Sequence, residues 1–199
     1  MSVTWWTSAR TTFRTACLTF DNMTIALSGF MGCGKSSVGR ELQGILGWPL
    51  TDLDEWIETQ EGRRIKDIFS TDGEGAFREM ELSALREITS SDNGNLILSL
   101  GGGTLTTPQC EEIVRLKTVC FYLSATADTL VENLLGATSD RPMLCGGGNG
   151  NEEERLRSRI SSLMASRLDI YLRAASHTIV TDGKTPAEIA GEIVSFIQK

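Results

Sequence analysis

The chain has 199 residues, of which 40% are hydrophobic and 23% are charged, and its 19 basic and 26 acidic residues give a formal net charge of −7. This composition is that of an ordinary globular protein, and it excludes collagen-like, wholly disordered and disulfide-scaffold classes. Apolar runs are too short to span a membrane, and the acidic balance disfavours a general nucleic-acid surface. We therefore expect one domain that acts without a membrane and without nucleic acid.

The first 22 residues differ in composition from the rest of the chain. Two arginines and one aspartate give them a net charge of +1, which leaves −8 for the other 177 residues. They lack the apolar core of a secretory signal, and their Arg- and Ser/Thr-rich composition is only loosely typical of an organelle transit peptide. We expect residues 1–22 to be an appendage, either upstream sequence ahead of a start at Met23 or a transit peptide. Residues 23–199 are then expected to form the folded domain.

The cysteines and the single histidine point to no metal site and no disulfide framework. The five cysteines are Cys17, Cys33, Cys110, Cys120 and Cys145. Because their number is odd and no pair has C-x-x-C spacing, we expect free thiols in a reducing cytoplasm. His177 lies in an apolar run without a serine or cysteine in a known triad context, so we expect a buried or strand-end histidine rather than a catalytic one.

From Met23 onward, five short apolar or β-branched runs alternate with longer helical patterns. The runs are Thr24–Ser28, Trp48–Thr51, Asn95–Leu100, Thr118–Leu123 and Thr178–Thr181. Strands that alternate with helices predict an α/β fold with a parallel sheet covered on both faces. Ligands of such sheets bind beyond the carboxyl ends of the strands, so functional residues are expected there.

Three of the helical segments have a clear apolar face. The faces are formed by Val38, Leu42, Ile45 and Leu46, by Leu156, Ile160, Leu163 and Met164, and by Ile189, Ile193, Phe196 and Ile197. The spacing i, i+4, i+7, i+8 places such residues on one side of a helix. The last helix also has a start signal, because Thr185 can cap it, Pro186 suits its first turn and Glu188 completes a capping box.

A phosphate-binding motif of the G-x-x-x-x-G-K-S type occupies residues 29–36, between the first predicted strand and a helix that begins near Lys35. In this motif the glycine backbone curls around phosphate oxygens, the lysine reaches the β- and γ-phosphates, and the serine hydroxyl ligates Mg²⁺. The helix N-terminus adds partial positive charge. ATP or GTP binding is predicted, although the N-K-x-D motif of GTPase switches is absent from the sequence. The expected nucleotide-binding residues here are Gly32, Cys33, Gly34, Lys35, Ser36 and Ser37.

Two carboxylates follow at the end of the second predicted strand, as Asp52-Leu53-Asp54. Alternation along an extended chain puts Asp52 and Asp54 on the same side, at the sheet edge where the phosphates lie. The alternative is a structural role, because the next residues are helical in pattern and an aspartate can cap a helix.

Further motifs come later in the chain. They are G-R-x-I at residues 62–65, I-F-x-x-x-G-E-x-x-F-R at residues 68–78, the strand-end Gly101-Gly102-Gly103, Asp140-Arg141-Pro142, and Arg167 on the long helix before Tyr171. With the phosphate-binding loop and the D-x-D, this combination resembles the shikimate kinase family over essentially all of residues 23–199. The resemblance implies a P-loop kinase of the nucleoside-monophosphate-kinase type, with a five-stranded parallel sheet in the order 2-3-1-4-5. It also implies a substrate-binding helical insert at about residues 53–82 and a lid at about residues 136–152.

The function that the resemblance implies is ATP-dependent phosphorylation of the 3-hydroxyl of shikimate, which gives shikimate 3-phosphate and ADP in aromatic amino acid biosynthesis. It gives catalytic roles to Lys35, Asp54 and Arg141, Mg²⁺ binding to Ser36 and Asp52, and substrate binding to Asp54, Arg78, Gly101, Gly102, Gly103 and Arg167. Asp54 either orients the hydroxyl or takes its proton. Planar guanidinium groups suit a carboxylate, which fits Arg78 and Arg167 as its ligands. Arg141, in the lid, reaches the transferring phosphate, and Lys184 and Pro186 complete the ATP site near the base.

Two features of the sequence modify this reading. A glycine-rich run at residues 145–151 follows Arg141 and is expected to be a mobile part of the lid. Leu134 stands where many members of the family have an arginine that stacks on adenine.

The alternatives to a shikimate kinase are a related small-molecule kinase, such as a gluconate kinase, and a non-catalytic nucleotide-binding module with a regulatory role. In the main reading the protein is a cytoplasmic monomer with Mg²⁺, ATP and shikimate as its ligands.

Overall fold

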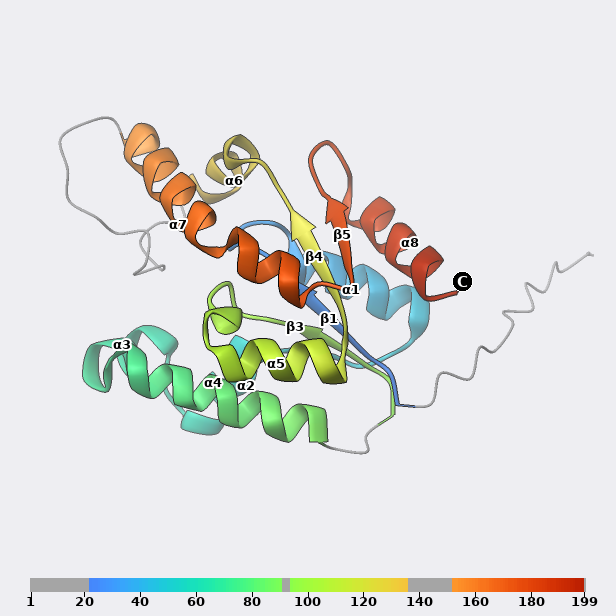
Figure 1. The fold of residues 1–199 in the computed structure, drawn as a ribbon, viewed down its shortest axis with the longest axis horizontal. Helices are drawn as coiled ribbons and strands as arrows, with labels where there is room; N and C mark the ends of the chain where they lie inside the picture. Colours follow the sequence, from blue (N-terminus) through green and yellow to red (C-terminus); the bar gives the residue numbers. More distant parts are fainter. Residues whose placement is uncertain (1–21, 91–93, 136–151, 199) are drawn as a thin grey trace, which may run out of the picture.

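In the computed structural model of the chain, residues 22–90, 94–135 and 152–198 are described, and they form one sheet with helices on both faces (Figure 1). The strands are β1 (Thr24–Ser28), β2 (Leu50–Asp52), β3 (Leu96–Ser99), β4 (Val119–Ser124) and β5 (His177–Val180). The helices are α1 (Lys35–Leu46), α2 (Leu53–Glu61), α3 (Ile65–Thr71), α4 (Gly73–Ser90), the 3₁₀ turn η1 (Thr104–Thr106), α5 (Pro108–Lys117), α6 (Ala127–Leu134), α7 (Glu152–Ala174) and α8 (Pro186–Ile197).

The five strands are parallel and lie in the order β2-β3-β1-β4-β5. The predicted α/β class and the sheet order that the resemblance implies are therefore confirmed. Each predicted strand is present, with ends that differ by one or two residues. In the register of the central strand, Ala26 is paired with Leu98 on one side and with Cys120 on the other.

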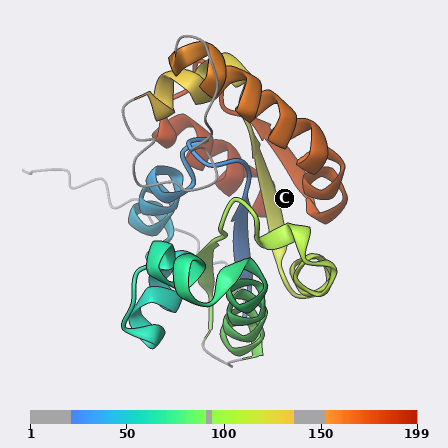
Figure 2. The same ribbon diagram turned by 90° about the vertical axis from the view of Figure 1, so that its left-hand side faces the viewer.

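Two hydrophobic cores lie on opposite faces of the sheet. On β1, successive side chains alternate between the faces, so Leu27 enters a core with α1, α6 and α8, whereas Ala26 enters a core with α2, α4 and α5. The long helix α7 contributes to both cores, with Ile160 in the first and Tyr171 in the second. This helix therefore passes over the carboxyl-end edge of the sheet, with α3 and α4 across from it (Figures 1 and 2).

The helix faces are mostly as predicted, with two errors, one in α1 and one in α8, where Phe196 is 38% exposed. Val38 and Leu42 are fully buried, but Ile45 is 53% exposed, so the prediction that it belongs to the apolar face of α1 is wrong. A residue seven positions after Val38 lies about 20° short of two full turns of an ideal helix, so Ile45 is on the side of Val38 that faces away from Leu42 and Leu46. The capping box that begins α8 is confirmed, with Thr185 and Glu188 exchanging hydrogen bonds.

The described cysteines and the histidine agree with the sequence analysis. Cys33, Cys110 and Cys120 are free and buried. His177 begins β5, where its ring stacks against the rings of Phe121 and Phe196 at centroid distances of 5.4 and 4.4 Å. No helix in the described part of the chain is long and apolar enough to span a membrane.

Several predictions fall on residues that the structure does not describe. Residues 1–21 lie outside the described ranges, and so do Arg141 and the glycine-rich run at residues 145–151. Residues 53–82, the expected insert, form α2, α3 and the first part of α4. Helix α4 then continues to Ser90 without a break.

Candidate active site

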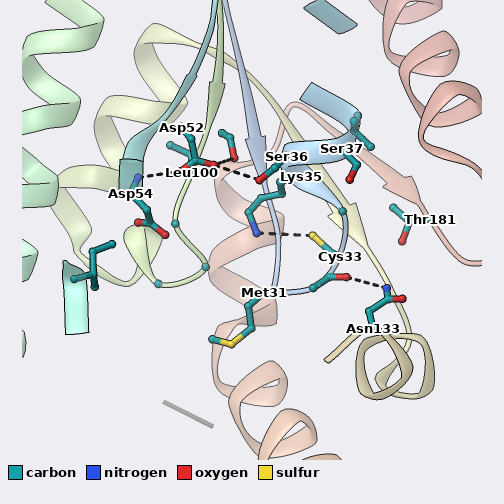
Figure 3. Close-up of a pocket in the computed structure, with 18 of the residues that line it drawn as sticks. Met31, Cys33, Lys35, Ser36, Ser37, Asp52, Asp54, Leu100, Asn133 and Thr181 are labelled. Atoms are coloured by element: carbon teal, nitrogen blue, oxygen red, sulfur yellow. Dashed lines mark hydrogen bonds between the residues drawn. The ribbon is translucent and has the colours of Figure 1, made fainter. Parts of the chain in front are cut away.

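A cavity of about 870 Å³ opens at the carboxyl ends of the strands (Figure 3). Its wall combines the loop after β1, the end of β2, the start of α4, the glycine triplet after β3 and the middle of α7. The predicted residues that line it are Gly32, Cys33, Gly34, Lys35, Ser36, Ser37, Asp52, Asp54, Arg78, Gly101, Gly102, Gly103, Arg167, Lys184 and Pro186. The parallel sheet thus brings segments that are far apart in sequence to one place, where a ligand is expected.

The loop after β1 has the backbone that phosphate binding requires. Gly34, the N-cap of α1, has a φ of 93°, which a residue with a side chain rarely adopts. The Lys35 ammonium group donates to the carbonyl oxygens of Gly29 at 2.9 Å and Phe30 at 3.1 Å, so it lies across the mouth of the loop. The first amides of α1 carry partial positive charge toward the same point. This arrangement can hold the phosphates of a nucleotide.

Asp52 lies at the centre of a hydrogen-bond cluster beside the loop. One carboxylate oxygen accepts from the Ser36 hydroxyl at 3.3 Å and from the Ser99 hydroxyl at 2.9 Å, and the other accepts from the Asp54 backbone N–H at 3.1 Å. The last bond caps α2. Asp52 therefore caps α2, and its carboxylate also lies beside Ser36 of the phosphate-binding loop.

Asp54 is the buried carboxylate of the site. Its pKa is raised from 3.8 to about 6, chiefly by burial and also by the neighbouring charges of Asp52 and Glu81, against the opposing effects of Lys35 and Arg78. A carboxylate with a pKa near 6 is mostly ionised at neutral pH, and it is a better proton acceptor than an ordinary aspartate. Geometry and pKa therefore suit Asp54 to the proton of a substrate hydroxyl.

Arg78 reaches the cavity from α4, and Glu81 holds it there. Glu81 is almost completely buried, accepts from the Arg78 guanidinium and also accepts from the Thr104 hydroxyl at 2.5 Å. Glu74 accepts from the other terminal nitrogen of Arg78 at 2.9 Å. Glu81 is not among the residues predicted from the sequence, although its position three residues after Arg78 on a helix is a detectable signal.

Arg167 reaches the cavity from α7 on the opposite side. It is only 6% exposed, donates to the Gly102 carbonyl oxygen at 3.0 Å and lies over the Phe30 ring with 6.0 Å between the guanidinium carbon and the ring centroid. Two cationic forks therefore face one space from α4 and α7. Such a pair can bind a carboxylate with defined geometry.

The space around the glycine triplet after β3 is too small for side chains at these three positions. A Cβ at Gly101 would lie 2.8 Å from an Asp54 carboxylate oxygen, and one at Gly103 would lie 2.7 Å from the Arg78 guanidinium. The backbone of Gly102 approaches the amide nitrogen of Met31, to which a Cβ would be 3.2 Å away. The triplet thus lets the acid, the arginine and the phosphate-binding loop come close together.

The far end of the cavity is the expected site of the nucleotide base. Lys184 and Pro186 line it, and the Lys184 ammonium group is paired with Glu192 at 2.6 Å. Leu134 is fully buried, against the position of Gly32. Its neighbour Asn133, which the analysis of the sequence did not select, donates to the Gly32 carbonyl at 2.9 Å and lines the cavity.

A phosphate-binding loop that faces a buried carboxylate and two convergent arginines defines the protein as a P-loop kinase for a small anionic acceptor. Comparison with known proteins makes the family plain. The family model "Shikimate kinase" matches residues 31–198. A shikimate kinase from Thermus thermophilus is 39% identical over 170 residues, which cover 85% of this chain and 87% of the relative. The chain belongs to the shikimate kinase family, whose members phosphorylate shikimate with ATP in aromatic amino acid biosynthesis.

Solved structures agree with this assignment. A shikimate kinase from Acinetobacter baumannii in complex with shikimate has a TM-score of 0.79 and 31% identity, over 90% of this chain and 95% of that one. A gluconokinase from Sinorhizobium meliloti has a TM-score of 0.53 and 18% identity, over 89% of this chain and 93% of that one, so it shares the fold alone. The family match therefore favours the main reading over the gluconate-kinase alternative.

Proposed function

We propose that Asp54, Arg78 and Arg167 bind shikimate in this cavity, and that the loop at residues 29–36 presents the γ-phosphate of ATP to it. The observation that carries the proposal is that the buried Asp54 lines the same cavity as Lys35 and Arg78, close enough for both charges to act on its pKa. The complex of the Acinetobacter relative with shikimate supports the choice of acceptor.

In the proposed reaction, the 3-hydroxyl oxygen of shikimate forms a bond to the γ-phosphorus. The bond from that phosphorus to the bridging oxygen breaks, and its electron pair leaves with ADP. Asp54 accepts the hydroxyl proton, because its raised pKa leaves it ionised yet basic at neutral pH. Lys35 neutralises charge on the phosphates, and Arg141, outside the described residues, keeps the role at the transferring phosphate that the resemblance implies.

The two arginines are proposed to bind the shikimate carboxylate. Arg78 is aligned by two glutamates, and Arg167 by the Gly102 carbonyl and the Phe30 ring. Guanidinium groups held in this way lose little freedom when the substrate binds, which favours precise placement of its hydroxyl.

Ser36 and Asp52 are proposed to hold Mg²⁺. Their hydroxyl and carboxylate oxygens lie 3.3 Å apart beside the phosphate-binding loop, and oxygen atoms of this kind are the ligands that Mg²⁺ prefers when phosphates complete its shell. A bound Mg²⁺ would neutralise charge on the β- and γ-phosphates. Ser99 positions Asp52 from β3 through a hydrogen bond of 2.9 Å.

We also propose that residues 23–199 act as a single cytoplasmic domain and as a monomer. The described cavity is built by one chain, with residues from α1, α2, α4 and α7. The free, buried thiols of Cys33, Cys110 and Cys120 suit a reducing compartment.

A coupled assay of ADP release tests the proposed function. ADP release should require shikimate, and Arg78→Ala should raise KM for shikimate at least tenfold, because a bidentate charged contact is lost. Asp54→Asn should lower kcat by a factor of about 10² to 10⁴ with KM for ATP nearly unchanged, because the proton acceptor is removed. ADP release without shikimate, or none at all, would contradict the kinase proposal, and the second result would favour the regulatory module.

A further inference from the structure

Tyr171 has a contact in the active site to which the reaction so far assigns no role. It lies on α7, one turn after Arg167, and is only 3% exposed. Its hydroxyl donates to the Gly102 carbonyl oxygen at 2.5 Å, and Arg167 donates to the same oxygen at 3.0 Å. Residues four apart on a helix lie on the same face, so the two side chains converge on one backbone atom of the glycine triplet.

That backbone atom belongs to the residue between Gly101 and Gly103, which border Asp54 and Arg78. On one side, Gly101 leaves no room for a Cβ beside Asp54, and on the other, Gly103 leaves none beside Arg78. A shift of the Gly102 carbonyl would therefore reach Arg167 directly and Arg78 through Gly103. Closely packed groups of this kind transmit displacements to one another.

The ring of Tyr171 is itself fixed. It stacks on the Tyr122 ring of β4, with 5.1 Å between centroids and 18° between planes. Burial raises the pKa of Tyr171 to about 12, so its hydroxyl remains a proton donor at any pH used for assay. The hydrogen bond to Gly102 is therefore held by a rigid aromatic pair rather than by a flexible side chain.

We propose that Tyr171 is a positioning residue for the carboxylate of shikimate. Its hydroxyl holds the Gly102 carbonyl in place. That carbonyl accepts a hydrogen bond from Arg167 and so orients it, and the adjoining Gly103 backbone limits the space available to the Arg78 guanidinium. The proposal rests on the role of the two arginines as carboxylate ligands. It predicts that loss of the hydroxyl weakens shikimate binding and leaves the nucleotide and the chemical step unaffected.

The variant Tyr171→Phe keeps the ring, its stacking and its burial, and removes only the hydroxyl. KM for shikimate should rise about three- to tenfold, the range expected when one hydrogen bond is lost. Both kcat and KM for ATP should stay within about twofold, because the lost interaction contributes equally to shikimate binding in the ground state and in the transition state. The matched control is Tyr122→Phe, which removes a hydroxyl from the same stacked pair without touching Gly102, and its KM for shikimate should be unchanged.

Arg167→Lys separates failure of this proposal from failure of the proposed function. If it raises KM for shikimate and Tyr171→Phe does not, the arginine binds the substrate but Tyr171 does not position it. If Arg167→Lys leaves KM unchanged, the carboxylate site is wrong and the role of Tyr171 fails with it. The proposal is also overturned if Tyr122→Phe matches Tyr171→Phe, or if Tyr171→Phe lowers kcat or raises KM for both substrates alike.

Discussion

At the scale of single residues, Asp54 illustrates a conflict between function and stability. A buried aspartate with a raised pKa suits proton transfer, but the folded state must then hold a charge that solvent would stabilise better. Its pKa is 3.8 in the reference state and about 6 in the fold. Between these values the folded protein binds more protons than the unfolded chain, so stability falls as pH rises through this window and stays lower above it.

The prediction is that Asp54→Asn stabilises the protein at neutral pH while it abolishes most activity. The gain in unfolding free energy at pH 7 should be about 1–3 kcal/mol, because about two pKa units correspond to about 3 kcal/mol at full effect, and the gain should shrink toward pH 4. Urea unfolding at the two pH values measures it. Asp182→Asn is the control of opposite sign, since hydrogen bonds from Thr129 and Thr126 lower the pKa of Asp182. An Asp54→Asn variant less stable than the wild type at pH 7 would refute the prediction.

At the scale of secondary-structure elements, the sequence predicts what depends on local spacing and misses what depends on long-range contacts. The phosphate-binding loop and the D-x-D are local patterns, and both lie in the cavity as expected. Tyr171 is missed because its contact is with a residue 69 positions away. For Glu81, the spacing to Arg78 is local, but its burial and its bond to Thr104, 23 positions away, are not. No local pattern in the sequence indicates contacts between residues that far apart in the chain.

Helix α1 shows the same limit within one element. Leu42 and Ile45 both satisfy the helical spacing, yet Leu42 is fully buried and Ile45 is 53% exposed. Periodicity identifies a face, whereas the width of the buried stripe depends on how closely the helix packs against β1, β3 and α8. The sheet and the C-terminal helix fix that geometry, and they come from distant parts of the chain.

This pair of residues gives a matched test of the packing of α1. Leu42→Ala should lower the free energy of unfolding by about 2–5 kcal/mol, because it leaves a cavity in the core. Ile45→Ala should change it by less than about 0.5 kcal/mol, because the removed atoms are largely in solvent. Chemical denaturation of both variants measures the difference. Equal losses would mean that Ile45 is buried and that the described orientation of α1 is wrong.

At the scale of the whole molecule, the net charge of −7 does not oppose the binding of anionic substrates. The cations Lys35, Arg78 and Arg167 line the cavity together with the carboxylates Asp52 and Asp54. Two of the cations lie in hydrogen bonds with backbone carbonyls, which hold their charge toward the cavity. Local charge at short distance outweighs a dispersed surface charge that salt screens.

At this scale we also predict that the first 21 residues do not contribute to the activity of the enzyme. The motifs lie from Gly29 onward, and in the described part of the chain both cores and the cavity are built from residues that begin at Met23. Deleting residues 1–21 should therefore leave kcat and both KM values within about twofold and Tm within about 2 °C, because no group of the site is removed. The control deletion of residues 1–26 also removes three of the five residues of β1, the strand that pairs with both β3 and β4, and should prevent folding. Circular dichroism melting and the ADP-release assay report on both, and a loss of activity in the shorter deletion would assign residues 1–21 a part in the working protein.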